Sequence, residues 1–181
     1  WFELGSRVNQ SESEGKTMKF TESYEYEAPV AKVWQMLSDP AFVTSRDENL
    51  EIPDPTVETN AQANQIVSTT SGEVPPSMIP AAAQRFLKGG AEFLIREEWR
   101  LVDATTIHGA LRAEGKGVPA YLQAQVELKQ TPAGNTKATM NGEIKVNIPF
   151  LGAKLEKQAL SFAPKLIAAD KKAATDWLAN N

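Results

Sequence analysis

The sequence contains no cysteine and a single histidine, His108, among its 181 residues. The absence of cysteine excludes disulfides, thiolate metal sites and thiol catalysis. A single histidine disfavours histidine-based metal sites and Ser-His-Asp triads, so we expect neither a metal nor a cofactor. We interpret His108 itself as a surface or core-edge residue rather than a catalytic one.

The chain also lacks a long apolar run and a strong charge of either sign. No stretch approaches the roughly 20 apolar residues that a membrane-spanning helix needs. No secretory signal is visible at the start, so we expect a cytoplasmic protein. The net charge of −4 predicts no general affinity for nucleic acid. The length, with 41% hydrophobic and 23% charged residues, fits one domain with a sizeable core.

Residues 1–17 differ in character from the rest of the chain. They show no hydrophobic periodicity, and their second half is polar and turn-rich. Met18 looks like a natural start, so we expect residues 1–17 to be an expression remnant or an extension, and residues 18–181 to form a single domain. An ordered leader would have to insert its apolar side chains into a groove of this chain or of a second copy, which would permit self-association. Those side chains are Trp1, Phe2 and Leu4.

The end of the chain predicts one long amphipathic helix over residues 149–180, with Pro149 at its first position. At 1.5 Å per residue such a helix is about 45 Å long, and Pro164 is expected to kink it. We expect Asp170 on its polar face together with the lysines. The apolar stripe comprises Leu151, Leu155, Leu160, Phe162, Leu166, Ile167, Ala173, Trp177 and Leu178. A helix of this length needs a broad surface to cover.

The preceding sequence supplies that surface as predicted strands, which alternate apolar and polar residues. Two short helices, residues 28–37 and about 41–46, follow the first strand and are separated by Ser38-Asp39-Pro40. The two prolines within residues 49–59 restrict any strand there to a short or edge position. The other strands are expected at residues 18–27, 65–74, 91–102, 105–113, 120–130 and 137–148. This order predicts an α+β fold with the sheet bent around the last helix.

The passage YEYEAPVAKVWQMLSDPAF, residues 24–42, resembles the opening of the START and birch-pollen-allergen-like superfamily, also called the polyketide cyclase and lipid transport group. The strand ending in Ala-Pro, the Val-Trp pair one turn later and the Ser-Asp-Pro helix stop carry this resemblance. The sequence IPFLG at residues 148–152 is similar to an actinobacterial family of unknown function within the superfamily. The resemblance covers residues 18 to about 178. It implies a helix-grip fold, in which a curved antiparallel sheet of about six to seven strands wraps around the long helix and encloses an apolar cavity.

The inward faces of the predicted strands provide the candidate lining of that cavity. Small residues such as Ala124 and Gly142 either leave space for a ligand or let the helix approach closely. Met140 suits a pocket of varying shape but also fills gaps in any core. The candidate ligand-binding residues are Phe93, Ile95, Glu97, Trp99, Leu122, Ala124, Val126, Met140, Gly142, Ile144, Phe162 and Leu166.

Two glutamates fall among the inward-facing apolar residues. Glu97 is in phase with Ile95 and Trp99, and Glu22 occupies the same phase within the first strand. A buried carboxylate needs a partner or becomes protonated, so either glutamate can anchor a ligand hydroxyl or act as a general acid or base. The alternative is a bulge that turns the side chain to solvent, or an ion pair with an arginine. The arginines considered for that pair are Arg96, Arg100 and Arg112.

Residues 75–90 interrupt the strand rhythm with three prolines, and two glycines close the segment. This composition indicates a segment that is fixed at one end and able to hinge at the other. It is a candidate lid over the cavity mouth, or an ordinary apolar plug. Its candidate lid residues are Met78, Ile79, Phe86 and Leu87.

We therefore expect a binder or carrier of a hydrophobic small molecule, lipid-like or polyketide-like, with no covalent chemistry. Two alternatives stay open. One is a cyclase or dehydratase type of enzyme that uses Glu97 or Glu22 as acid and base. The other is a protein-interaction domain with a filled core, whose groove takes an apolar segment of a partner. The superfamily includes carriers, receptors and cyclases, so fold alone does not choose between them.

Overall fold

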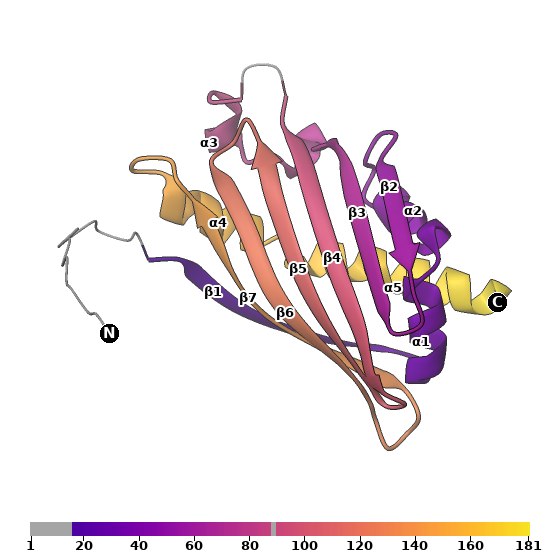
Figure 1. Ribbon diagram of the computed structural model, residues 1–181. Coiled ribbons are helices and arrows are strands. Elements are labelled where there is room, and N and C mark those ends of the chain that lie inside the picture. Colours follow the sequence, from indigo (N-terminus) through magenta and orange to yellow (C-terminus); the bar gives the residue numbers. More distant parts are fainter. Residues whose placement is uncertain (1–15, 88–89) are drawn as a thin grey trace, which may run out of the picture.

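A seven-stranded antiparallel sheet forms the body of the protein (Figure 1), and the predicted α+β plan is confirmed. The computed structural model describes residues 16–87 and 90–181, so the predicted insertion of Trp1, Phe2 and Leu4 lies outside the described residues. The strand order is β1-β7-β6-β5-β4-β3-β2. The strands are β1 (Met18–Tyr26), β2 (Thr56–Ala61), β3 (Gln65–Glu73), β4 (Glu92–Asp103), β5 (Thr106–Lys116), β6 (Ala120–Gln130) and β7 (Thr136–Val146).

The first strand in the sequence and the last one pair side by side. β1 runs antiparallel to β7, from Met18 opposite Ile144 to Tyr26 opposite Thr136. β2 forms the opposite edge of the sheet, as the prolines that precede it predict. Most polar residues of β4 to β7 face the uncovered side of the sheet, and most apolar residues face the side that carries the helices.

Two short helices, α1 (Val30–Leu37) and α2 (Pro40–Asn49), follow β1. Asp39 caps α2, because its Oδ1 accepts a hydrogen bond from the backbone N–H of Ala41 at 2.9 Å. α2 extends past residue 46, where the sequence pattern predicted its end, and this extension adds Asp47, Glu48 and Asn49 to the helix. Tertiary packing of its buried face overrides weak local propensity here.

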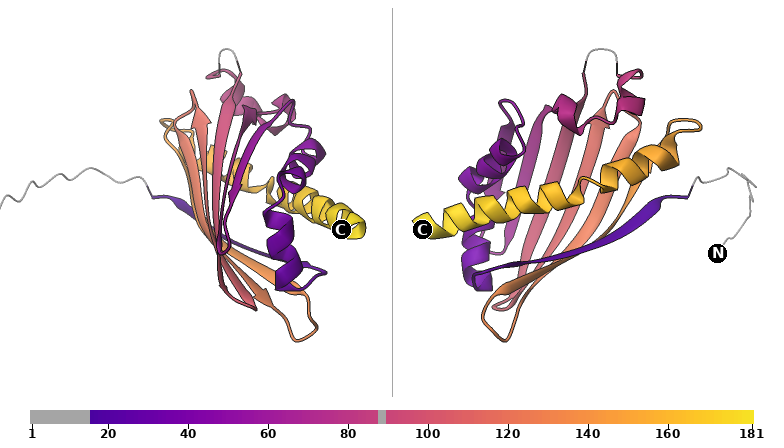
Figure 2. Two further views of the ribbon diagram at one scale, coloured as in Figure 1. Left: turned by 45° about the vertical axis from the view of Figure 1, so that its right-hand side comes forward. Right: turned by 180° about the vertical axis from the view of Figure 1, so that it is seen from behind.

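The predicted long C-terminal helix is confirmed as a bent element that crosses the concave face of the sheet (Figure 2). It consists of α4 (Gly152–Leu160) and α5 (Ala163–Asn180), and the break immediately precedes Pro164 in the first turn of α5. The predicted start at Pro149 is wrong. Phe150 has a left-handed backbone, with φ of 63°, so the chain makes a turn there before the helix begins at Gly152. No helix in the described part of the chain is long and apolar enough to cross a membrane.

Two residues of α5 differ in exposure from what was expected. Asp170 was expected on the polar face, but it is only 8% exposed, whereas Leu166 of the expected apolar stripe is 39% exposed. The buried residues of α5 are Ala169, Asp170, Ala173 and Ala174. Asp170 precedes Ala173 by three positions and Trp177 by seven, so helical spacing places it on the same face as these two stripe residues, although its charge had suggested the polar face.

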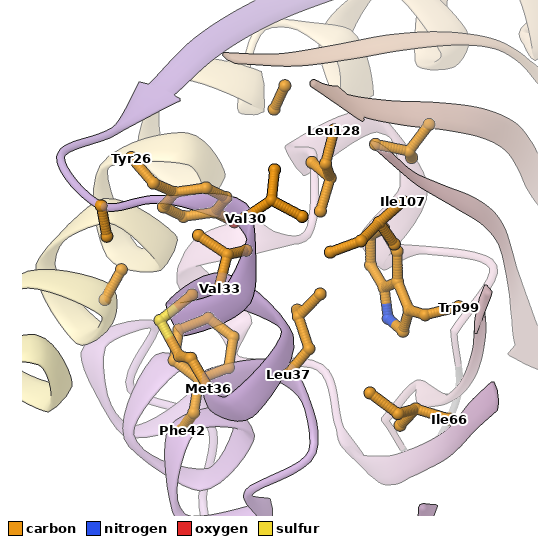
Figure 3. Close-up of a cluster of buried hydrophobic side chains, with 14 of the residues drawn as sticks. Tyr26, Val30, Val33, Met36, Leu37, Phe42, Ile66, Trp99, Ile107 and Leu128 are labelled. Atoms are coloured by element: carbon orange, nitrogen blue, oxygen red, sulfur yellow. The ribbon is translucent and has the colours of Figure 1, made fainter. Parts of the chain in front are cut away.

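The main hydrophobic core closes one end of the concave face (Figure 3). There α1 and α2 pack against the sheet and the C-terminal half of α5. Trp99 covers Gly109 on the neighbouring strand so closely that a Cβ at position 109 would lie 2.3 Å from Trp99 Cζ3. The labelled members of this core are Tyr26, Val30, Val33, Met36, Leu37, Phe42, Ile66, Trp99, Ile107 and Leu128.

Candidate functional site

Side chains on the helix-covered face of the sheet are buried at one end of the strands and only partly buried further along them. On β4, Trp99 and Glu97 are 7% and 3% exposed, whereas Ile95 and Phe93, in the same phase, are only partly buried. On β6, Leu122 is likewise only partly buried. An apolar side chain on the helix-covered side that stays partly accessible lies next to solvent or to an unfilled space. Phe93 also packs against Leu50, Ile52 and Ala169. This stretch of β4 and β6 is the accessible part of the predicted lining.

The position of α5 is consistent with that space. α5 packs mainly against α2, and also against β1 and α1, so its closest backbone contacts lie at the two sides of the concave face. α4 packs on β7 and β1. Phe162, at the junction of the two helices, is partly buried. The helix therefore crosses the concave face of the sheet (Figure 2), and Ala169 joins Phe93 of β4 in a small buried cluster.

Several predicted lining residues belong instead to packed regions. Ala124 and Val126 of β6 and Ile144 of β7 are 4%, 3% and 8% exposed, while Met140 is partly buried against the main core. A Cβ at Gly142 would lie 2.6 Å from Phe20 Cζ and 2.8 Å from Ala124 Cβ. The ring of Phe20 thus fills the space above Gly142, so this space is neither open to a ligand nor occupied by the helix.

Two hollows lie on the opposite, uncovered side of the sheet. The larger, about 610 Å³, is open and lined mainly by outward polar residues of β1 and β4 to β7, among them Lys19, Arg96 and Gln123. The smaller involves Asn60 and Gln65 at the β2 edge. Ligand sites are commonly concave and mostly apolar. We therefore assign these hollows, most of whose lining residues are charged or amides, to the solvated face and keep the helix-covered face around Ile95 and Leu122 as the candidate site.

A buried ion pair lies where the accessible part of the inner face meets the closed core. Arg46 of α2 donates from Nη1 and Nη2 to Glu97 Oε1 and Oε2 at 3.1 and 2.8 Å. An arginine partner for Glu97 was one of the alternatives, but the three arginines considered were wrong. Arg96 is the neighbour of Glu97 on β4 and therefore points to the uncovered face, where it pairs with Glu98 at 2.7 Å. Arg100 and Arg112 also have the exposed phase of their strands.

The ion pair continues to α5 and β1 through Asp170. Asp170 Oδ1 lies 3.6 Å from Arg46 Nη1, and Tyr26 donates its hydroxyl hydrogen to Asp170 Oδ2 at 2.6 Å. The Tyr24 hydroxyl lies 3.3 Å from that of Tyr26, and the two rings meet edge to face at 5.4 Å. We call Arg46, Asp47, Glu97, Asp170, Tyr26 and Tyr24 the polar cluster. It spans the interior from β1 to β4.

Burial and charge set the protonation behaviour of the polar cluster. Burial raises the pKa of Asp47 to about 6, and nearby Arg46 opposes this shift. Burial also raises the pKa of Asp170, against the opposing effects of Arg46 and the Tyr26 hydrogen bond. For Arg46, burial disfavours the charge, but Glu97, Asp170 and Asp47 outweigh it and hold its pKa well above its usual value. Arg46 is therefore a permanent cation among carboxylates.

The two candidate acid–base residues differ in what surrounds them. Both oxygens of Glu97 accept hydrogen bonds from Arg46, which makes Glu97 a poor proton shuttle. Glu22 is partly buried opposite Met140, and within residues 16–87 and 90–181 its carboxylate has no hydrogen bond or ion pair. Within the same residues, no group of three or more acidic or histidine side chains is placed to hold a metal ion.

The candidate lid packs on the end of β7 and on α4. Ile79 follows η1 (Pro76–Met78) and Leu87 follows α3 (Ala81–Gln84), and both join a buried cluster around Val146 and Leu155. Met78 is partly buried. Phe86 is 47% exposed, and the Arg85 guanidinium lies 4.7 Å from its ring centre. Whether this segment opens as a lid stays a prediction.

The sequence interpretation missed Arg46, Asp47 and Asp170 as site residues. Arg46 follows the buried Phe42 by four positions in the same helix, a spacing that places both on one face and that the predicted helix of residues 41–46 already contained. The spacing of Asp170, three positions before Ala173 and seven before Trp177, was likewise a signal for the buried face of α5. His108 is exposed and lies 3.6 Å from Glu127 on the uncovered face, in agreement with its interpretation as a surface residue.

Solved structures with the same fold cover most of this chain at low sequence identity. The aromatase/cyclase Zhui from Streptomyces sp. R1128 is 12% identical with a TM-score of 0.54, and the match covers 88% of this chain and 92% of that one. Norcoclaurine synthase from Thalictrum flavum is 15% identical with a TM-score of 0.54, covering 100% and 99%. A START superfamily protein from Mycobacterium smegmatis is 12% identical with a TM-score of 0.52, covering 88% and 98%. These likenesses confirm the expected helix-grip fold.

Two further comparisons use the sequence alone. A search of curated proteins finds no match to this chain. Residues 21–178 match the sequence model of one protein family, a range that includes the opening passage, the polar cluster and both C-terminal helices. The chain therefore belongs to the family described as "Protein of unknown function (DUF2505)".

Proposed function

We propose that this protein binds or carries a hydrophobic small molecule, lipid-like or polyketide-like, in the space between the sheet and α4 and α5. The observation that carries the proposal is the partial exposure of Phe93, Ile95 and Leu122 on the helix-covered face of the sheet. An aqueous space against such side chains is unfavourable, and an apolar ligand that displaces this water gains about 25 cal/mol for each Å² that it buries. The fold supports the proposal, because this architecture commonly encloses ligands.

The first experiment is native mass spectrometry of the purified protein, followed by solvent extraction. We expect an adduct of lipid or polyketide size that is released on denaturation, and its mass gives the chemical class of the ligand. A bare protein mass, together with no binding of the neutral apolar dye Nile red, argues against the proposal. That pair of results favours the interaction-domain alternative.

The second experiment fills the proposed space and uses an adjacent residue as a matched control. In Ile95→Trp, the larger ring projects from the helix-covered face and should lower Nile red affinity at least tenfold. Leu94 is the next residue on β4 but is 44% exposed on the uncovered face, so Leu94→Trp should retain the affinity. Equal binding by the two folded variants would contradict the proposed position of the ligand.

The expected cytoplasmic location of the protein stays a prediction, which cell fractionation tests.

A further inference from the structure

We infer that the cavity takes a ligand whose polar end is an uncharged hydrogen-bond donor, such as a hydroxyl group, and that it discriminates against anionic lipids such as fatty acids. This inference rests on the proposed function, since it requires a ligand in that space. It concerns the polar cluster, which holds the buried charges at the inner end of the accessible lining.

The polar cluster is placed to meet a ligand. On β4, Glu97 separates the closed core at Trp99 from the accessible lining at Ile95. The side chains of Arg46 and Asp170 keep 14% and 11% of their surface exposed, so the cluster is not sealed. A ligand that lies against Ile95 therefore has its end next to these groups.

The guanidinium of Arg46 is already committed to carboxylates. Its Nη1 and Nη2 are bound by Glu97, its Nη1 also faces Asp170 at 3.6 Å, and its Nε lies 3.9 Å from Asp47 Oδ1. Three carboxylates thus share one cation. A ligand carboxylate would add a fourth negative charge in a region of low dielectric without gaining a free cation, which is unfavourable.

The Tyr24 hydroxyl oxygen is a hydrogen-bond acceptor that remains available in the cluster. Tyr26 uses its one hydroxyl hydrogen on Asp170, so Tyr24 must donate to Tyr26 across their 3.3 Å contact, which leaves lone pairs on the Tyr24 oxygen. Asp47 is 2% exposed, and its Oδ2, which has no hydrogen-bond partner among the described residues, is fully buried, so it lies out of reach of a ligand. Tyr24 is only partly buried, and a ligand hydroxyl can donate to its oxygen.

The test compares decan-1-ol with decanoate, which have the same chain length, as competitors of Nile red at pH 7.5. We expect the alcohol to displace the dye at a concentration at least tenfold lower than the acid. Equal or stronger displacement by decanoate would overturn this inference and leave the carrier proposal intact. If Nile red does not bind, or neither competitor displaces it, the proposed cavity is refuted, and this inference with it.

A variant separates the effect of the cluster from the greater hydrophobicity of the alcohol. Glu97→Gln removes one carboxylate from Arg46 and should shift the preference toward decanoate at least fivefold. Glu98→Gln is the matched control, because Glu98 is the next residue and pairs with Arg96 on the exposed face, so its preference should equal that of the wild type. Asp170→Asn replaces Glu97→Gln if that variant does not fold, as judged by thermal melting. An unchanged preference in a folded variant of the cluster overturns the inference.

Discussion

Trp177 donates its indole N–H to Asp39 Oδ2 at 2.8 Å, although the two residues lie at opposite ends of the domain's sequence. Asp39 Oδ1 at the same time caps α2 through the N–H of Ala41. One carboxylate thus joins the start of α2 to the last turns of α5. The contact fixes the end of α5 farthest from the accessible lining.

This double use of Asp39 predicts an order among its substitutions. Asp39→Asn keeps the cap, but its side-chain amide N–H then faces the indole N–H of Trp177, so that two donors meet. The substitution should lower the free energy of unfolding by about 1 kcal/mol. Asp39→Ala loses the cap as well and should cost about 2 kcal/mol. Urea denaturation measures both. The exposed Asp176→Asn should stay within about 0.5 kcal/mol of the wild type, and a reversed order for the Asp39 variants would contradict the assignment.

Removal of the cation from the polar cluster should be strongly destabilising. Arg46→Met leaves Glu97, Asp170 and Asp47 buried without their shared partner, at a cost of about 3–5 kcal/mol in unfolding free energy. Arg96→Met breaks an exposed pair with Glu98 and should cost less than about 1 kcal/mol. Thermal and chemical denaturation of both variants test this contrast. Similar losses for the two arginines would show that the buried network contributes little.

The close contact between Trp99 and Gly109 makes the glycine hard to replace. A methyl group at position 109 would lie 2.3 Å from the Trp99 ring, so Gly109→Ala should force the indole to move and should cost about 1–3 kcal/mol. Ala110→Ser, at the next position and in the opposite phase of β5, serves as the control and should be nearly neutral. An unchanged urea midpoint for Gly109→Ala would mean that the ring shifts at no cost.

The raised pKa of Asp47 predicts a pH-dependent gain from Asp47→Asn. Burial raises this pKa from 3.8 to about 6, so the folded protein binds the proton more tightly than the unfolded chain does. The free energy of unfolding therefore falls as pH rises from about 4 to about 6, and the loss persists above that range. Asp47→Asn should stabilise by about 1–3 kcal/mol at pH 7.5 and should lose this advantage near pH 4.

The exposed neighbour Glu48 provides the control for that experiment. Glu48→Gln should show little change at either pH, because Glu48 is exposed at the surface. Denaturation midpoints across the pH range measure the difference between the two variants. A destabilising Asp47→Asn at pH 7.5 would show that the attraction of Arg46 outweighs the cost of burial.

The sequence by itself determined the order and type of most elements and, for the strands, their buried faces. Alternation placed β6 at residues 120–130, the bounds the structure has, because successive side chains of a strand point to opposite sides. The same alternation put Glu97 inside. Local signals such as Asp39-Pro40 located the start of α2, since capping depends on only a few neighbouring residues.

The tertiary structure alone decided which residues meet. Arg46 and Glu97 lie 51 positions apart, and their pairing depends on how α2 docks on the sheet, which no local period encodes. Asp170 lies on the same face of α5 as Ala173 and Trp177, but only the fold brings Arg46 and Tyr26 to its carboxylate. Phe20 fills the space that Gly142 leaves. Periodicity shows which side of an element is apolar, but long-range packing sets the partner of each side chain and so the chemistry of the site.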